Sequence, residues 1–288
     1  MKVSLTALVA PCFVFLGGCD KPSSSMTQIA FSETLSESEA AVPVAILSIS
    51  PDQRCTPQKK IFAGCTGSRV GNDIVITAAH CTEGIIDLYV FDKTVDHFRL
   101  LNNLPDRNFA CVDDGSLEQL KSAIPILKED ISVPANGADV AVIRIRQKLS
   151  HPIVRVGSLM AFKPKLVTLL GLGRTTCVKG EPGREEVFPG SNIFGAGRVT
   201  LTVSDAKYDG PEPWFVALKS GTLTHPCPGD SGSGIFTMKG NDLVLLGVDS
   251  RTSTDFSLKG TTHFFTNFSE PSVASFLRKE GILFIENK

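Results

Sequence analysis

Short apolar runs separated by turn residues occupy most of the chain beyond residue 43. They are rich in β-branched and aromatic residues and are bounded by Gly, Asn, Asp or Pro, which is typical of strands. The nine runs cover residues 44–49, 73–79, 86–91, 139–145, 166–171, 198–203, 214–218, 243–248 and 263–268. This pattern predicts an all-β fold, arranged as a sandwich or a barrel.

The last apolar positions follow a helical period instead. Ser269 is a candidate N-cap, and Pro271 would stand in the first turn. Val273, Phe276 and Leu277 then fall on one face of a helix. Since Gly281 is a typical end signal, we predict a C-terminal helix before it.

The N-terminus carries a different kind of apolar run. After Lys2, the run from Val3 to Leu16 is too short to span a bilayer comfortably, which is typical of a secretory signal. It ends in Leu16-Gly17-Gly18-Cys19, which resembles the lipobox of bacterial lipoproteins. That resemblance implies a signal peptide over residues 1–18, lipidation of Cys19, and a location on the bacterial cell envelope, at its periplasmic side or its surface. The alternative is ordinary signal cleavage, with Cys19 incidental.

The following segment lacks any sustained apolar period. Residues 20–42 are rich in Ser, Thr and Glu, so they cannot bury enough surface to offset the entropy of ordering them. We therefore predict a flexible tether over residues 19–42 and one domain over residues 43–288.

Composition and charge restrict the function by exclusion. The 288 residues are 42% hydrophobic and 20% charged, which is ordinary for a soluble fold. A formal net charge of −1 gives no reason to expect a nucleic acid or an acidic membrane surface as partner. We expect a monomer that meets the membrane only through its lipid, and the function has to come from local sites.

The cysteine content is compatible with an exported, disulfide-bonded domain. Of eight cysteines, Cys12 leaves with the signal peptide and Cys19 carries the lipid. The remaining cysteines are Cys55, Cys65, Cys81, Cys111, Cys177 and Cys227. An even number permits full pairing but leaves many connectivities open.

Three fragments contain the residue types of nucleophilic catalysis. His80 follows a predicted strand in Thr-Ala-Ala-His-Cys, Asp139 begins another in Ala-Asp-Val-Ala-Val, and Ser231 lies in the glycine-rich Gly-Asp-Ser-Gly. A serine hydroxyl is a weak nucleophile, so it needs a base to take its proton and an acid to orient that base. Together the fragments predict a catalytic site.

The order His, Asp, Ser in these motifs resembles the chymotrypsin-like (trypsin-type, S1) serine protease family, from about Val44 to the terminal helix. An α/β-hydrolase would show the order Ser, Asp, His around a G-x-S-x-G elbow. The resemblance implies two six-stranded antiparallel β-barrels with the site between them. It also implies a serine endopeptidase that hydrolyses peptide bonds through an acyl-enzyme, without cofactor or metal.

Carried over residue by residue, the resemblance makes His80 the general base, Asp139 its orienting partner and Ser231 the nucleophile. The backbone N–H groups of Gly229 and Ser231 would form the oxyanion hole. The same resemblance pairs Cys65 with Cys81. For the other cysteines we favour the pairs Cys177–Cys227 and Cys55–Cys111.

The predicted substrate pocket departs from that of trypsins. By the resemblance, His225 stands at its base, where trypsins carry Asp, and His263 lies on the opposite wall. The two histidines either fill the pocket and make it shallow, or favour an acidic substrate side chain. The remaining wall would be Ser250, Arg251 and Thr252, with Asp249 beside it arguing against an acidic preference.

The activation motif of trypsin-type zymogens is missing. No Ile-Val-Gly-Gly sequence occurs between Cys19 and Cys65, so Asp230 needs a partner other than a new N-terminus. Either the enzyme matures without N-terminal insertion, or its oxyanion loop stays unformed. The second case predicts a lipid-anchored binding protein that uses the protease fold.

Three weaker features complete the sequence. Gly171-Leu172-Gly173 is similar to the family's Gly-Trp-Gly turn. His97 and His151 lack paired ligand spacing, so we expect both at the surface and no metal site. The long interval between His80 and Asp139 predicts a surface insertion over about residues 102–134.

Overall fold

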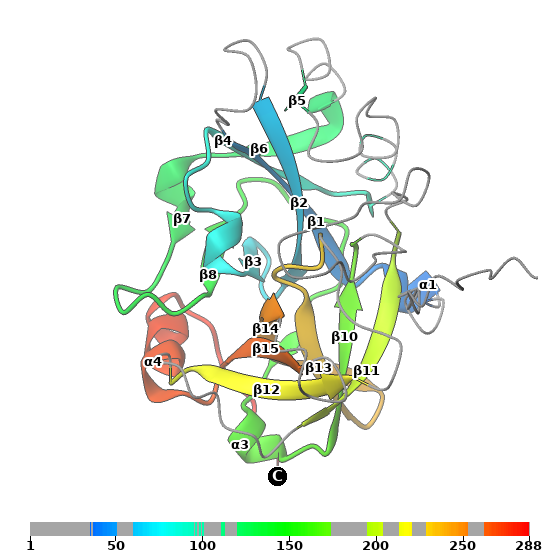
Figure 1. Ribbon diagram of the computed structural model, residues 1–288, viewed down its shortest axis with the longest axis vertical. Helices are drawn as coiled ribbons and strands as arrows, with labels where there is room; N and C mark the ends of the chain where they lie inside the picture. The colour runs from blue at the N-terminus through cyan, green and yellow to red at the C-terminus, as the bar shows by residue number, and fades with distance from the viewer. Residues whose placement is uncertain are drawn as a thin grey trace, which may run out of the picture.

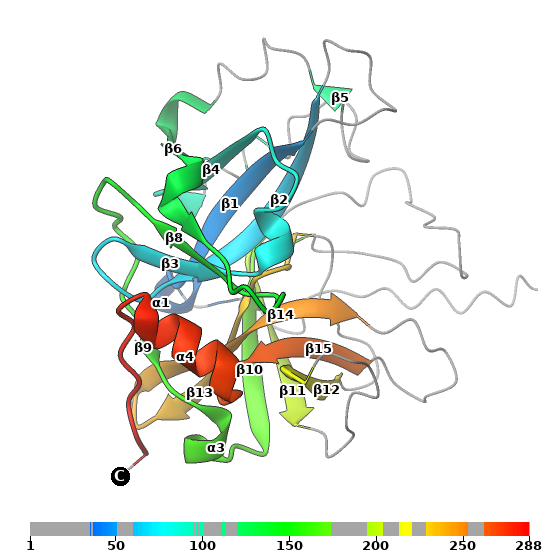
Figure 2. The same ribbon diagram turned by 90° about the vertical axis from the view of Figure 1, so that its left-hand side faces the viewer.

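Two sheets, antiparallel except for the parallel β9–β14 pair, lie one above the other in the computed structural model of the chain (Figures 1 and 2). The structure describes residues 35–50, 60–100, 111–112, 120–173, 195–203, 213–220, 229–252 and 262–287, except residues 36, 95, 97 and 99. Cys19, Cys55, His97, Cys177, His225 and Cys227 lie outside the described residues.

The first sheet is an open path in the order β6-β4-β1-β2-β3-β8-β7, with β5 paired to β2. Its strands are β1 (Pro43–Ser50), β2 (Lys60–Arg69), β3 (Ile74–Thr77), β4 (Asp87–Phe91), β5 (Cys111–Val112), β6 (Ala123–Ile126), β7 (Ile131–Ser132) and β8 (Ala141–Arg144). The predicted surface insertion is therefore only partly correct, because its second half forms β6 and β7 and buries Ile124 and Ile126.

The second sheet closes on itself. Its order is β13-β10-β11-β12-β15-β14-β9, and an additional β13–β14 pairing closes a ring of six strands. The strands are β9 (Arg155–Val156), β10 (Leu166–Gly171), β11 (Gly197–Val203), β12 (Phe215–Ser220), β13 (Gly234–Lys239), β14 (Asp242–Thr252) and β15 (Thr262–Asn267). The prediction of an all-β fold with two antiparallel barrels is confirmed, although the first barrel is only nearly closed.

Helices are few and short in the described part of the chain. They are α1 (Glu37–Ala40), the 3₁₀ turns η1 (Ala79–Cys81) and η3 (Lys128–Asp130), α3 (Leu159–Phe162) and α4 (Pro271–Lys279). No helix in the described part of the chain is long and apolar enough to cross a bilayer.

All nine predicted strands are present, but the apolar pattern missed β2, β5, β6, β7, β9 and β13. In β2 a Cβ at Gly67 would lie 2.8 Å from Val75 and 2.9 Å from Ile46, so only glycine fits between β1 and β3. Small residues of this kind remove the apolar alternation by which a strand is recognised.

The terminal helix is present where it was predicted, with a different cap. The Glu270 carboxylate accepts hydrogen bonds from the amides of Ser272 at 2.8 Å and Val273 at 3.0 Å. Ser269 is therefore not the N-cap. Its hydroxyl oxygen instead accepts the amide of Met160 at 2.9 Å.

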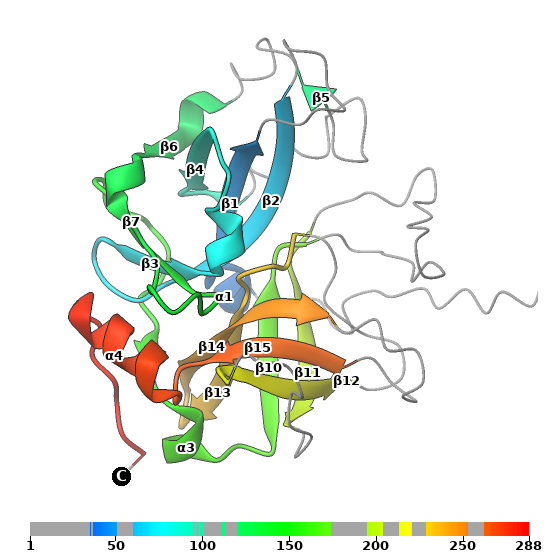
Figure 3. The same cartoon turned by 60° about the vertical axis from the view of Figure 1, so that its left-hand side comes forward.

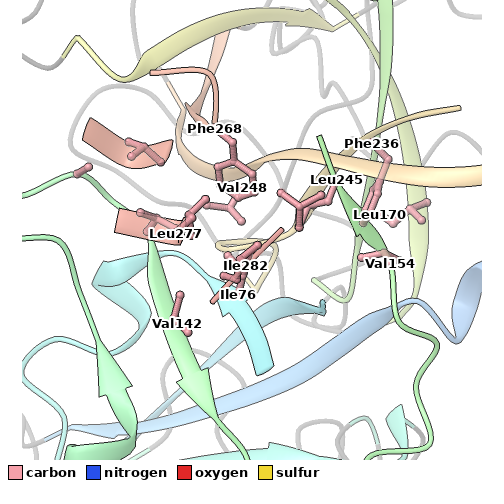
Figure 4. Packing of buried hydrophobic residues seen from close by; sticks show 14 of the residues in the cluster. Ile76, Val142, Val154, Leu170, Phe236, Leu245, Val248, Phe268, Leu277 and Ile282 are labelled. Carbon is pink, nitrogen blue, oxygen red and sulfur yellow. The ribbon is translucent and has the colours of Figure 1, made fainter. Parts of the chain in front are cut away.

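One apolar cluster ties the two sheets and α4 together (Figure 4). Ile76 of β3 and Val142 of β8 meet Leu170 of β10 and Leu245 of β14, while Leu277 adds the buried face of α4. Because interiors are close-packed, this shared core fixes the ends of β3 and β8 relative to β14.

Two further predictions need correction. Part of the predicted tether is ordered, since α1 precedes a buried Val42 and Glu39 pairs with Arg198 at 2.7 Å. His151 is not at the surface but 4% exposed, with Nδ1 2.8 Å from the Ala41 oxygen and Nε2 3.2 Å from the Phe91 oxygen. Both departures arise where the entering chain packs onto the barrels.

Candidate active site

His80 is presented by the short turn that follows β3. In η1 the neighbouring Ala79 and Cys81 are buried, whereas the side chain of His80 is 41% exposed. Burial of the flanking residues thus directs the imidazole outward. Figure 3 shows that β3, which precedes this turn, lies on the side of the first sheet that faces β14 and β15 of the second.

A disulfide fixes this turn to β2. Cys65 and Cys81 are bonded, with Cα atoms 6.2 Å apart, which is the pairing that the family resemblance implies. His80 and the two sulfurs lie within 4.8 Å of one another. Since the sulfurs are bonded to each other and offer no thiolate, this group does not fit a metal ion.

Asp139 holds His80 by two hydrogen bonds. One carboxylate oxygen lies 2.8 Å from the Nδ1 of His80, and the other accepts the His80 amide at 2.9 Å. The hydroxyl of Ser250 also donates to the carboxylate, and the hydroxyl of Thr266 donates to the Asp139 carbonyl at 2.8 Å. Strands β14 and β15 of the second sheet therefore hold Asp139 in place, and Asp139 in turn orients His80 of the first sheet.

Opposing effects determine the charge of Asp139. Burial by itself raises the pKa of this carboxyl, but the hydrogen bond and charge of His80 and the hydrogen bonds from Ser250 and the His80 amide lower it below its ordinary value. Asp139 is therefore a carboxylate at neutral pH, as required of a group that stabilises an imidazolium.

The loop carrying Ser231 is docked on β2 and β14. The Ser231 carbonyl accepts the amide of Thr66 at 2.8 Å, and the Thr66 hydroxyl donates to the Gly229 carbonyl at 2.9 Å. On the other side, the Gly232 amide donates to the Asp249 carbonyl at 2.8 Å. Cys81 Sγ lies 3.6 Å from the Ser231 carbonyl oxygen, so the loop reaches the turn that carries His80.

Two glycines allow the loop its conformation. Gly229 has φ +101° and Gly232 has φ +79°, in the region that side chains penalise. A Cβ at Gly232 would also lie 2.1 Å from the Thr77 hydroxyl and 2.4 Å from the Thr66 carbonyl. The loop can approach the end of β3 only because it has no side chain there.

The donors predicted for the oxyanion hole are available. In the described part of the chain, the amides of Gly229 and Ser231 donate to no protein acceptor. Nor does a hydrogen bond join Ser231 to His80 among the described contacts. Such nucleophile–base bonds are often long without substrate.

Asp230 has a partner in place of a new N-terminus. It is fully buried, and its carboxylate accepts the amide of Gly173 at 2.8 Å. A Cβ at Gly171 would lie 2.1 Å from one carboxylate oxygen of Asp230, and a Cβ at Gly173 would lie 2.6 Å from it. The turn resembling Gly-Trp-Gly is thus the backbone cradle of this acid.

Of the residues predicted to line the substrate pocket, the structure describes the side chains of His263 and Ser250. His263 in β15 is 0% exposed and pairs with Leu218 and Thr252 across the sheet. Ser250 turns its hydroxyl to Asp139 rather than to a pocket. Arg251 and Thr252 are the last residues of β14, whose side chains are outside the described part of the chain, as is His225.

Three residues that support the site, Thr66, Thr266 and Asp249, were not predicted from the sequence to do so. Thr66 and Thr266 bind the loop and Asp139 through polar side chains that nothing in the sequence singles out. Asp249 is 5% exposed although it is acidic. Its burial could have been predicted, because it directly follows the apolar run 243–248.

Neither of the two favoured disulfides falls wholly within the described residues. Cys111 pairs through its backbone with Ile61 in β5–β2, but its predicted partner Cys55 lies outside the described residues, as does the pair Cys177–Cys227. These pairings stay predictions.

Comparisons with known proteins agree with this fold. The structure is similar to the scabies mite inactivated protease paralogue S-I1, with TM-score 0.54 and 17% identity, covering 86% of this chain and 97% of that one. It is also similar to the scabies mite paralogue S-D1, with TM-score 0.54 and 16% identity, covering 90% and 100%. A search of curated protein sequences finds no match.

The family profile described as Trypsin matches residues 51–275, which include His80, Asp139 and Ser231 and every described strand except β1. The match covers well over half of the chain, and the sheets and loops described above have the matching architecture. The chain therefore belongs to the trypsin family.

Proposed function

We propose that the protein is a serine endopeptidase that hydrolyses peptide bonds through an acyl-enzyme. In this proposal Ser231 attacks the peptide carbonyl, His80 takes the serine proton and later gives it to the leaving amine, and Asp139 orients His80. A water molecule then attacks the acyl-enzyme. His80 takes a proton from this water and returns it to Ser231, which leaves as the acyl group departs as the acid.

The observation that carries the proposal is the buried Asp139 carboxylate at 2.8 Å from the Nδ1 of His80. This bond assigns the proton of His80 to Nδ1 and leaves Nε2 as the base. The outward-facing imidazole and the adjacent Ser231 loop support the same assignment.

The oxyanion hole is the second support. A tetrahedral intermediate bears a negative oxygen, and preorganised donors at that point are worth roughly 3 to 4 kcal/mol each. The amides of Gly229 and Ser231, held by Thr66 and free of protein acceptors in the described part of the chain, suit this role.

A second candidate is a lipid-anchored binding protein in which this hole stays unformed. It is favoured by the two structural relatives whose names describe inactivated proteases, and by the lack of an Ile-Val-Gly-Gly motif between Cys19 and Cys65. The Gly173 amide on Asp230 argues for the enzyme, because it supports the loop without a new N-terminus.

A fluorophosphonate probe distinguishes the two candidates. We expect covalent labelling of the folded protein that disappears in Ser231→Ala and His80→Ala. Ser68→Ala is the matched control, because Ser68 is a buried serine on β2 outside the proposed catalytic residues. Folded protein that stays unlabelled over the whole accessible pH range would identify the binding protein.

The proposed substrate preference follows from His263. Its full burial favours the shallow pocket over one that pairs with an acidic side chain. We therefore expect cleavage of a mixed peptide library after small residues, widened to larger ones in His263→Gly. Enrichment of Asp or Glu before the cleaved bond, weakened in His225→Ala, would instead establish the acidic pocket.

A further inference from the structure

Asp249 connects the nucleophile loop to the acid that orients His80. Its amide donates to the Ser233 carbonyl at 2.8 Å, and its carbonyl accepts the Gly232 amide at 2.8 Å. The next residue, Ser250, donates its hydroxyl to Asp139. Any force on Asp249 therefore acts on both halves of the site.

The side chain of Asp249 is buried, and one of its carboxyl oxygens has no donor among the described residues. The residue is 5% exposed, and its Oδ1 has no hydrogen-bond partner among the described residues. By contrast, Asp139 accepts from His80 and Ser250, and Asp230 accepts from Gly173. Of these three acids, Asp249 alone has a buried carboxyl oxygen without a hydrogen-bond partner in the described part of the chain.

The groups around Asp249 make a charge there more costly. The carboxylates of Asp230, in the nucleophile loop, and Asp139, before β8, both repel a negative charge on Asp249. The nearby cation-forming group, His80, is hydrogen-bonded to Asp139. On β15, His263 shares a face with Phe265, the residue paired with Asp249. Burial first, and then the charges of Asp230 and Asp139, raise the pKa of Asp249 well above its ordinary value.

We propose that Asp249 is a positioning residue that supports the active site as a neutral carboxylic acid, and that its ionisation as pH rises forces the Ser231 loop and Asp139 apart. The effect on activity rests on the proposed endopeptidase function. The protonation of Asp249 itself does not, so the two are tested separately.

Unfolding equilibria test the protonation. An acid whose pKa is raised on folding stabilises the fold fully only below the pKa of the unfolded chain, about 4, and this contribution is lost as pH rises toward the folded value. In a Ser231→Ala background, we expect the unfolding constant to grow by up to tenfold per pH unit relative to that of the additional Asp249→Asn variant.

Two variants secure this measurement. Asp242→Asn is the matched control, because Asp242 lies on the same strand and its side chain is 56% exposed, so we expect a small offset instead of a tenfold slope. Asp249→Leu serves as a second neutral variant where the amide is not tolerated. A pH-independent difference between the parent and both Asp249 variants would overturn the proposal.

Labelling kinetics test the consequence for the site. We expect the rate of fluorophosphonate labelling of the wild type to fall reversibly as rising pH ionises Asp249, and that of Asp249→Asn to persist at least one pH unit higher, about tenfold faster there. Equal upper pH limits would overturn the positioning role. Absence of labelling in both proteins would overturn the endopeptidase function, while the unfolding experiment still decides the state of Asp249.

Discussion

At the residue scale, the number of donors facing each buried acid determines which acid carries charge. Asp139 accepts from the ring and amide of His80 and from Ser250, so it is ionised despite its burial. Asp249 is similarly buried, but one of its carboxyl oxygens lacks a donor among the described residues, and its pKa is raised by burial and by the neighbouring carboxylates. The pKa values of two buried acids in the same neighbourhood therefore shift in opposite directions, depending on the donors that each acid has.

Replacing Ser250 by alanine tests the donor to Asp139. Removal of a hydrogen bond to a charged group is expected to lower the free energy of unfolding at pH 7 by about 1.5 to 3 kcal/mol. Because the pKa of Asp139 is lowered in the fold, the stability it contributes is present above the unfolded pKa and is lost as pH falls through the folded value. The loss in Ser250→Ala should therefore shrink below about pH 3, as measured by urea unfolding.

Ser48→Ala is the control for this prediction. The Ser48 hydroxyl is buried but donates to a neutral carbonyl, that of Ala63, at 3.2 Å. Its effect on stability should be independent of acidification. A Ser250→Ala loss that is equally constant would show that the bond to Asp139 does not depend on the carboxylate charge.

Replacing Gly171 by alanine tests the cradle of Asp230. The new Cβ would lie 2.1 Å from the Asp230 carboxylate, so Asp230 has to move. We expect about 1 to 3 kcal/mol of destabilisation and slower fluorophosphonate labelling. Gly71→Ala is the control, since its Cβ would meet only the side chain of Ile74 at 3.3 Å. Equal stability and labelling of the two variants would contradict the cradle.

At the element scale, β2 connects the parts of the site. Thr66 donates its amide to Ser231 and its hydroxyl to Gly229, and its carbonyl accepts the hydroxyl of Thr77 at the end of β3. Its neighbour Cys65 holds the His80 turn through Cys81. One strand therefore sets the separation between the proposed base and nucleophile.

Removing the disulfide tests this connection. The bond closes a loop with a sequence separation of 16, so the double variant Cys65→Ala, Cys81→Ala should lose about 3 kcal/mol of unfolding free energy. Labelling of Ser231 should slow as well, because the turn of His80 is released from β2. Labelling that stays fast in the folded double variant would show that packing alone holds the turn.

At the scale of the whole molecule, one apolar core is shared by the two sheets and packs them together. Figure 4 shows residues of β3, β8, β10, β14 and α4 meeting there, and the proposed site lies where β14 and β15 approach the first sheet. The described domain is preceded by the predicted tether, which enters β1 through α1.

The lipid anchor is tested on the full chain in a bacterial host. We expect incorporation of an alkyne-labelled fatty acid and recovery of the protein with membranes, both lost in Cys19→Ala. Cys12→Ala is the matched control, because Cys12 belongs to the predicted signal peptide, and it should leave both unchanged. Release of wild-type protein into the soluble fraction without label would point to ordinary signal cleavage.

Local patterns were sufficient for much of the architecture. The strands over residues 166–171 and 243–248 follow from apolar runs between turn residues, and the helix before Gly281 follows from its period. Its cap did not follow, because Ser269 and Glu270 both have side chains that accept hydrogen bonds and only the path of the chain selects between them.

The sequence by itself determined the strand-rich fold, the family and the residue types of the site, since these depend on short motifs and on their order: His80, then Asp139, then Ser231. Only the tertiary structure decided that Ser250 serves Asp139, that Gly173 serves Asp230, and that one carboxyl oxygen of Asp249 is buried without a donor in the described part of the chain. The physical reason is that burial and hydrogen bonding join residues far apart in the chain, so the charge of each acid is a property of the packed molecule.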